Sequence, residues 1–211
     1  MSYGFSDSRV RIFMDFWNFS KNWRELTKVL PEKNLDWSIF PATIVEHLDQ
    51  IAPLRRSSKE LRAVKVYASS KPLEFCLDDD VTRGDVMDEH RRKIWLREYL
   101  DQLTSYTVDI STQLRRTVSC TVCNKDTGHY VEQGVDTKMA IDLVALASRD
   151  LYDIAVLITD DTDLIPSIQC VQDALDKQVI HVGFDNKRRN DVKNEAWGHL
   201  FIDDMLSDIT N

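Results

Sequence analysis

The chain lacks the long apolar runs and the dense cysteines that mark membrane proteins and disulfide scaffolds. No stretch reaches the roughly 18 consecutive apolar residues that span a bilayer, and residues 1–13 show no basic segment followed by an uninterrupted apolar one. Its 4 cysteines are too few to staple 211 residues. We therefore expect a soluble protein of the reducing cytoplasm, with no membrane partner.

Basic residues are also fewer than acidic ones. The 27 Lys and Arg residues are outnumbered by 35 Asp and Glu, which gives a formal net charge of −8. Such a chain does not coat nucleic acid by bulk electrostatics, although a local site is still open to it. Basic residues gather in four short clusters, at 55–59, 90–93, 115–116 and 187–189. Solvated surface charge is the alternative interpretation of each cluster.

Repeats and low-complexity segments are absent, and short apolar segments alternate instead with longer helical patterns. Strands are predicted over 9–16, 62–69, from 106, over 154–158 and over 179–182. Helices are predicted from about 41, from 85, from 136 and over 162–177; residues 71–85 are expected to form a loop, and 194–205 fit a strand or a helix. This alternation predicts one domain spanning residues 1–211, with a three-layer α/β/α core over about 9–205 and a mostly parallel central sheet.

Aspartates follow two of the predicted strands. Asp15 ends the first, and Asp160, Asp161 and Asp163 follow the strand at 154–158. Asp136 lies in the opening turn of a predicted helix. Because ligands of parallel sheets bind beyond the carboxyl ends of the strands, carboxylates from these three sources are predicted to converge. Mg²⁺ and Mn²⁺ prefer such oxygen ligands, and either ion would relieve the repulsion among them.

Each aspartate also has a purely structural interpretation. Asp161 or Thr162 would cap the helix that follows, and Asp136 is at a common capping position. Asp15 is harder to explain in this way. It follows an apolar strand and precedes Phe16 and Trp17, so its carboxylate is expected to be partly buried and to need a partner.

Three motifs together give the chain a family resemblance. The segments "FMDFWNF", "EQGVDTKMAIDL" and "VLITDDTDLIP", in this order, resemble the NYN branch of the PIN-like nuclease superfamily, the LabA-like or DUF88 group, over about residues 10–203. Family members show D-x-x-N, then K-G-V-D with a second Asp six residues on, then S-G-D-S-D-F-x-P. The matching positions are Asp15 and Asn18, Asp136 and Asp142, and Asp161 and Asp163.

The chain departs from this family pattern at three positions. Gln133 replaces a lysine, Asp160 a glycine and Leu164 a phenylalanine. None of these changes removes a presumed metal ligand. Asp160, however, adds a charge where a compact turn is usual.

The resemblance implies a ribonuclease that hydrolyses RNA phosphodiester bonds with one or two Mg²⁺ or Mn²⁺ ions. The implied ligands are Asp15, Asp136, Asp161 and Asp163. The implied supporting residues are Asn18, Asp142, Thr159, Asp160 and Thr162, and Lys138, Arg91 and Arg92 would contact the RNA, with single-stranded RNA and tRNA as candidates. Asp142 belongs in the supporting group because six helical residues rotate it about 240° from Asp136. Trp17 or Trp23 would stack a base or pack in the core.

The segment "CTVCNKDTGHY" raises a second metal question, because C-x-x-C is the turn spacing of a zinc knuckle. Cys120 and Cys123 supply two ligands for a structural Zn²⁺, with His129 and the distant Cys76 to complete the four. A hairpin tip that merely carries two thiols is the alternative. We expect a small β-hairpin insertion here in either case.

Two other functions stay open. A non-catalytic PIN-like module would keep the acidic pocket for docking RNA or protein, with Asp160 disturbing the metal site. A phosphohydrolase with an aspartate nucleophile is disfavoured, because Asp15 lacks the D-x-D-x-T context of such enzymes. A homodimer is a further expectation, since PIN-like domains often dimerise.

Overall fold

The computed structural model describes residues 7–55, 57–72, 82–119, 121–123, 126–185 and 191–210. Its main sheet has six strands in the order β3-β2-β1-β6-β7-β8, and every neighbouring pair is parallel. The strands are β1 (Ser8–Asp15), β2 (Lys59–Ser70), β3 (Tyr106–Thr112), β6 (Ile154–Ile158), β7 (Gln178–Gly183) and β8 (Gly198–Phe201).

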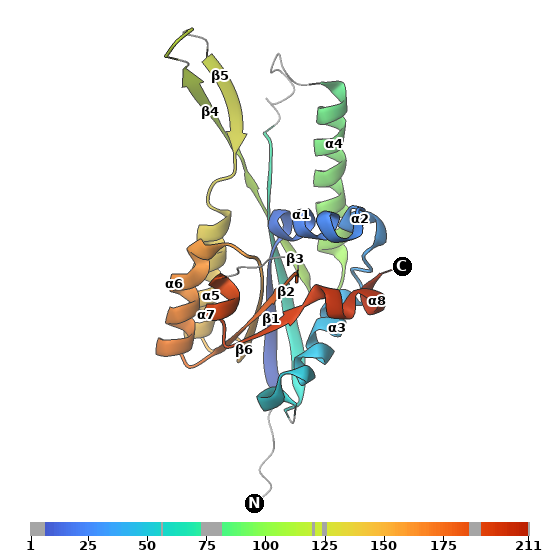
Figure 1. Ribbon diagram of the computed structural model, residues 1–211, viewed down its shortest axis with the longest axis vertical. Coiled ribbons are helices and arrows are strands. Elements are labelled where there is room, and N and C mark those ends of the chain that lie inside the picture. The colour runs from blue at the N-terminus through green and yellow to red at the C-terminus, as the bar shows by residue number, and fades with distance from the viewer. Residues whose placement is uncertain are drawn as a thin grey trace, which may run out of the picture.

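Helices cover both faces of this sheet (Figure 1). One side carries α1 (Phe16–Thr27), α2 (Pro31–Asn34), α3 (Phe40–His47), α4 (Arg83–Ile94) and α8 (Leu206–Ile209). The other carries α5 (Val135–Ser148), α6 (Ile165–Gln169) and α7 (Asp191–Glu195). The predicted three-layer α/β/α fold around a parallel sheet is confirmed.

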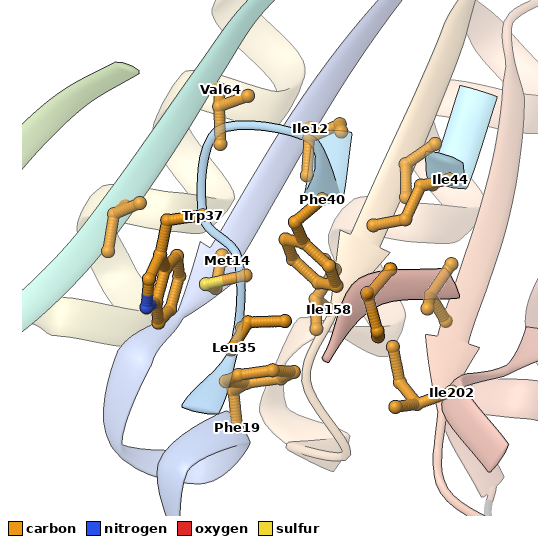
Figure 2. Packing of buried hydrophobic residues seen from close by; sticks show 14 of the residues in the cluster. Ile12, Met14, Phe19, Leu35, Trp37, Phe40, Ile44, Val64, Ile158 and Ile202 are labelled. Atoms are coloured by element: carbon orange, nitrogen blue, oxygen red, sulfur yellow. The ribbon is translucent and has the colours of Figure 1, made fainter. Parts of the chain in front are cut away.

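Side chains of the central strands alternate between two apolar cores. Val10, Ile12 and Met14 of β1 pack into the core under α1 and α3, where Figure 2 shows Ile12 and Met14 among the aromatic rings. Phe13 packs into the second core, under α5 and α6. All five residues of β6 are buried, as expected for a strand covered on both faces.

The order in which strands are added to the sheet reverses between β1 and β6. From β1 the sheet grows through β2 to β3, and from β6 it grows the opposite way through β7 to β8. The two strands are paired from Val10 with Ile154 to Met14 with Ile158. In open parallel sheets, the carboxyl ends of two such strands form the crevice in which ligands bind.

A separate antiparallel hairpin joins β3 to α5. It consists of β4 (Leu114–Ser119) and β5 (Asp126–Val131), which confirms the expected hairpin insertion. The hairpin and α4 extend from the same end of the molecule (Figure 1). Cys120 lies outside the described residues.

The structure corrects several predicted boundaries. Phe16 opens α1 instead of ending the first strand, because Asp15 caps the helix. Helix α4 starts at Arg83, inside the predicted loop, of which residues 73–81 lie outside the described part. The helix predicted over 162–177 is a 3-10 turn (Thr162–Leu164), α6 and a π turn (Cys170–Ala174), after which Asp176 adopts φ 54° and turns the chain into β7.

The ambiguous segment near the C-terminus contains both kinds of element. Strand β8 is followed by a 3-10 turn (Ile202–Met205) and by α8. Residues 95–102 likewise continue α4 as a π turn (Trp95–Tyr99) and a 3-10 turn (Leu100–Gln102), so the helix predicted from residue 85 extends to Gln102. No helix in the described ranges is long and apolar enough to cross a membrane.

Candidate active site at the carboxyl edge of the sheet

Asp15 lies where β1 ends, at the crevice between β1 and β6, and is 5% exposed. Its Oδ1 accepts hydrogen bonds from the backbone N–H groups of Trp17 (3.0 Å) and Asn18 (3.1 Å), so the carboxylate caps α1. Burial raises the pKa of Asp15 to about 7 against these hydrogen bonds, and the charges of Glu132 and Asp136 contribute to the rise.

The loop after β6 brings Asp161 and Asp163 to the same edge. Thr159 is buried, and its hydroxyl donates to Asp15 Oδ2 (3.4 Å) and accepts from the Asp161 N–H (3.2 Å). Asp161 Oδ1 accepts from the Asp163 N–H (2.9 Å) and caps the following 3-10 turn. Of the two residues predicted to cap this helix, Asp161 is therefore the cap, and Thr162 is an exposed residue of the turn.

Asp136 reaches the site from the first turn of α5. Gly134, with φ 80°, occupies the cap position, so Asp136 is not the cap. Burial is the first cause that raises the pKa of Asp136, and the charges of Asp161, Glu132 and Asp163 add to the increase. These couplings show that the carboxylates predicted from three parts of the sequence are electrostatic neighbours.

Glu132 is a member of the site that the sequence did not reveal. It is exposed, and its carboxylate accepts a hydrogen bond from the hydroxyl of Ser69 at the end of β2. Its charge raises the pKa values of both Asp15 and Asp136. The only sequence signal was its place in the segment that precedes Asp136. We call Asp15, Glu132, Asp136, Asp161 and Asp163 the acidic cluster.

Asp160 is bound by neighbouring elements. Its side chain is 8% exposed, and its two oxygens accept hydrogen bonds from Asn22 Nδ2 of α1 (3.1 Å) and His181 Nε2 of β7 (3.2 Å). Its N–H donates to Asn18 Oδ1 (3.3 Å), which gives Asn18 a role in holding this loop. A Cβ on Gly183 would lie 2.4 Å from the His181 ring, so this network needs the glycine.

Asp142 lies in α5 but faces β2. Its carboxylate accepts a hydrogen bond from the Tyr67 hydroxyl (2.7 Å) and forms an ion pair with Lys65 (2.5 Å). The rotation of the helix thus separates it from Asp136, as the spacing predicted. Its contacts are those of a residue that packs α5 against the sheet.

The predicted RNA-contacting residues lie on two sides of the site. Lys138 and Arg91 each form an ion pair with an aspartate, at 2.8 and 3.0 Å. Arg92 lies over the Trp17 ring, 5.0 Å from its centre. Trp23 is fully buried, so it packs in the core and does not stack a base. The cluster at 187–189 lies outside the described residues.

The zinc hypothesis stays a prediction. Cys123 is exposed in the turn between β4 and β5, and His129 is exposed in β5. Cys120 and Cys76, the other expected ligands, lie outside the described residues.

The acidic cluster suits a hard divalent cation. The cluster is not preformed as a metal site, because within the described ranges no group of three or more His, Cys, Asp or Glu side chains is placed where it could hold a metal ion. Its donors are all carboxylate oxygens, the ligands that Mg²⁺ and Mn²⁺ prefer. A cation would also offset the burial and mutual repulsion that raise the pKa values of Asp15 and Asp136.

Comparisons with known proteins agree with this fold. The family model described as "NYN domain" matches residues 9–203, nearly the whole chain. A crystal structure of a protein of unknown function from Vibrio parahaemolyticus matches over 100% of both chains, with a TM-score of 0.55 and 15% sequence identity. At that identity, the likeness shows a shared fold alone. No curated protein matches the chain.

Proposed function

The chain belongs to the NYN domain family of the PIN-like nuclease superfamily, and on that premise we propose that it is a ribonuclease that uses Mg²⁺ or Mn²⁺. The observation that carries this proposal is the environment of Asp15, a buried carboxylate of raised pKa beside four others in the crevice between β1 and β6. This is the place where parallel sheets bind ligands. RNA phosphodiester hydrolysis is the chemistry that the family and the carboxylates support together.

The residues of the acidic cluster and Thr159 would have different roles, according to their positions. Asp15, Asp136 and Asp161 would hold the ion, with Asp163 and Glu132 at the exposed rim. When bound, such an ion activates a water molecule and offsets the charge on the scissile phosphate, so no Ser, Cys or His nucleophile is required. The Thr159 hydroxyl, between Asp15 and the Asp161 N–H, keeps the ends of β1 and β6 in register.

Cleavage of a labelled single-stranded RNA by the purified chain tests this proposal. We expect cleavage with Mn²⁺ or Mg²⁺, and its loss in the Asp161→Asn variant. The asparagine oxygen can still cap the 3-10 turn, so circular dichroism and the melting temperature should change little. Equal cleavage in excess EDTA would contradict the proposal, because the carboxylates alone supply no Lewis acid.

The alternative of a non-catalytic binding module depends on Asp160 disturbing the metal site. Hydrogen bonds to Asn22 and His181 hold that carboxylate against α1 and β7, which supports the enzyme over the module. Calorimetric titration with Mn²⁺ separates the two. Binding that is abolished by Asp15→Asn supports the enzyme, and the absence of binding by the wild-type chain supports the module.

A further inference from the structure

A groove lies between α1, α2 and α4, three helices that lie side by side in Figure 1. Two adjoining cavities of about 430 Å³ each form it, and Leu30, Glu32 and Arg92 line both. Trp17 lines the first cavity and Trp95 the second. Most of the other residues that line the two cavities are charged, and cavities of this size accommodate ligands as large as a nucleotide.

One wall of the groove is a stripe along α1. Trp17, Lys21 and Arg24 are four and three residues apart, so they share a face of the helix, and all three line the first cavity. The stripe runs about 10 Å from Trp17. Lys21 and Arg24 are exposed, and neither pairs with a carboxylate in the described part of the chain. Two cations are thus available to anionic ligands.

The opposite wall holds a third cation in a fixed position. The Arg92 guanidinium lies 5.0 Å from the centre of the Trp17 ring and 3.6 Å from the Glu89 carboxylate. Glu89 also accepts a hydrogen bond from the Lys71 N–H (2.9 Å), which ties α4 to the end of β2. A guanidinium held in this way can present its remaining N–H groups to a phosphate in the geometry that suits it.

Trp17 joins the groove to the acidic cluster. Its backbone N–H donates to Asp15, and its indole Nε1 donates to the carbonyl of Ser69 (3.0 Å). The Ser69 hydroxyl in turn donates to Glu132. An extended ligand that lies in the groove would therefore lead directly to the carboxylates of the acidic cluster.

Glu32 provides the groove with a buried hydrogen-bond acceptor that a ligand could satisfy. Its Oε2 is buried and makes no hydrogen bond within the described residues. A buried acceptor without a donor costs roughly 1–3 kcal/mol, and a carboxylate accepts hydrogen bonds only. The exocyclic amino groups of cytosine, adenine and guanine would supply the donor, whereas uracil has no amino group and offers only its ring N3–H.

We propose that this groove binds an unpaired segment of the RNA strand next to the scissile phosphate. Lys21, Arg24 and Arg92 hold its phosphates, and Glu32 accepts a hydrogen bond from the amino group of an inserted base. Only an unpaired strand can turn its bases between the walls. The inference rests on the proposed function, and it names single-stranded RNA as the substrate class.

Fluorescence anisotropy with labelled oligonucleotides tests the groove without catalysis. The full chain is titrated in EDTA against oligocytidine and oligouridine 12-mers and against a 12-base-pair duplex. We expect the Lys21→Gln/Arg24→Gln variant to bind oligocytidine about tenfold more weakly, with a salt slope lower by about 1.4, the value for two lost phosphate contacts. The matched control, Arg62→Gln/Arg149→Gln, makes the same change in net charge at exposed positions of the opposite edge and should stay within about twofold.

Base preference provides the second readout. The wild-type chain should bind oligocytidine more tightly than oligouridine, and Glu32→Gln should remove most of that difference. Equal affinity of the two double variants, or a duplex bound as tightly as the single strands, would overturn the proposal. Equal affinity for the two single strands would overturn the role of Glu32.

The groove and the proposed function can fail separately. If the wild-type chain cleaves RNA with Mn²⁺ but the groove variants bind normally, only the groove proposal fails. If the variants lose affinity as expected while no metal ion supports cleavage, only the proposed function fails.

Discussion

Replacing Asp15 by asparagine should stabilise the metal-free protein at alkaline pH. Burial raises the pKa of this carboxyl to about 7 in the folded state, from about 4 in an unfolded chain. Between these values the folded state holds a proton that the unfolded state has released, so the free energy of unfolding falls as the pH rises. Asparagine carries no charge at either pH, and its side-chain oxygen can still accept the two N–H groups that Asp15 caps.

The size of the effect follows from the shift in pKa. Each unit is worth about 1.4 kcal/mol, so between pH 5 and pH 8 the wild-type chain should lose about 2–3 kcal/mol relative to Asp15→Asn. The contribution is absent below the unfolded pKa, where both states are protonated. It levels off above the folded pKa, where both are ionised. The variant should therefore gain its advantage mainly between pH 4 and pH 7, the range between the unfolded and the folded pKa of Asp15.

Urea unfolding in EDTA, from pH 5 to pH 8.5, measures this difference. Asp163→Asn is the matched control, because it changes an exposed residue of the same cluster and keeps Asp15; its free energy of unfolding should fall with pH much as that of the wild-type chain does. Mn²⁺ should stabilise the wild-type chain at pH 8 and have little effect on Asp15→Asn. A stability difference that is constant or narrows as the pH rises would refute the account of Asp15 as a buried carboxylate of raised pKa.

Three further predictions concern the surroundings of the acidic cluster. Asp160→Gly should lower the free energy of unfolding by about 1–3 kcal/mol, because Asn22 and His181 lose a buried acceptor; unchanged urea unfolding would contradict it. Gly183→Ala should be destabilising as well, since the new Cβ would lie 2.4 Å from the His181 ring, and a melting temperature equal to that of the wild type would show that the ring can move. Asp142→Asn should lower stability while calorimetric Mn²⁺ affinity stays within about twofold, because its contacts are to β2 and not to the cluster; a large loss of affinity would place Asp142 in the metal site.

Strand β6 shows why much of the fold could be predicted from the sequence. It lies at the centre of the sheet with every residue buried, so its only compatible sequence is a short apolar run, and polar residues mark both ends. The predicted and observed bounds, 154–158, agree. The alternation of such runs with helical patterns is enough to predict parallel strands with crossover helices.

The type of each helical turn could not be predicted from the sequence, and the segment after β6 shows the reason. Residues 162–174 form 3-10, α and π turns in succession. These turns differ by one residue in the reach of each hydrogen bond, while the buried side chains Leu164, Ile168 and Val171 keep the three- to four-residue spacing of one apolar stripe. Periodicity therefore predicts that a helix is present without predicting its type.

Glu132 could not be found for a different physical reason. It ends no strand, opens no helix and is exposed, so neither spacing nor hydrophobicity marks it. Its place in the cluster depends on Ser69, which is 63 residues earlier in the chain. Such a position is decided by how the end of β2 meets the segment before α5, and that is a property of the tertiary structure.

The crowded aspartates after β6, in contrast, can be sorted by the alternation of strand side chains. Ala155 and Leu157 face the core under α5, and so does Phe13 of the paired strand. Continuing that alternation places Asp15, Thr159 and Asp161 on the side of α5, where Asp136 lies, and Asp160 on the side of α1. The contacts agree, because Thr159 bonds to Asp15 and Asp161, whereas Asp160 bonds to Asn22 of α1. Asp160 thus occupies the glycine position of the family pattern with its carboxylate bonded to α1 and β7, and it anchors the loop that presents Asp161.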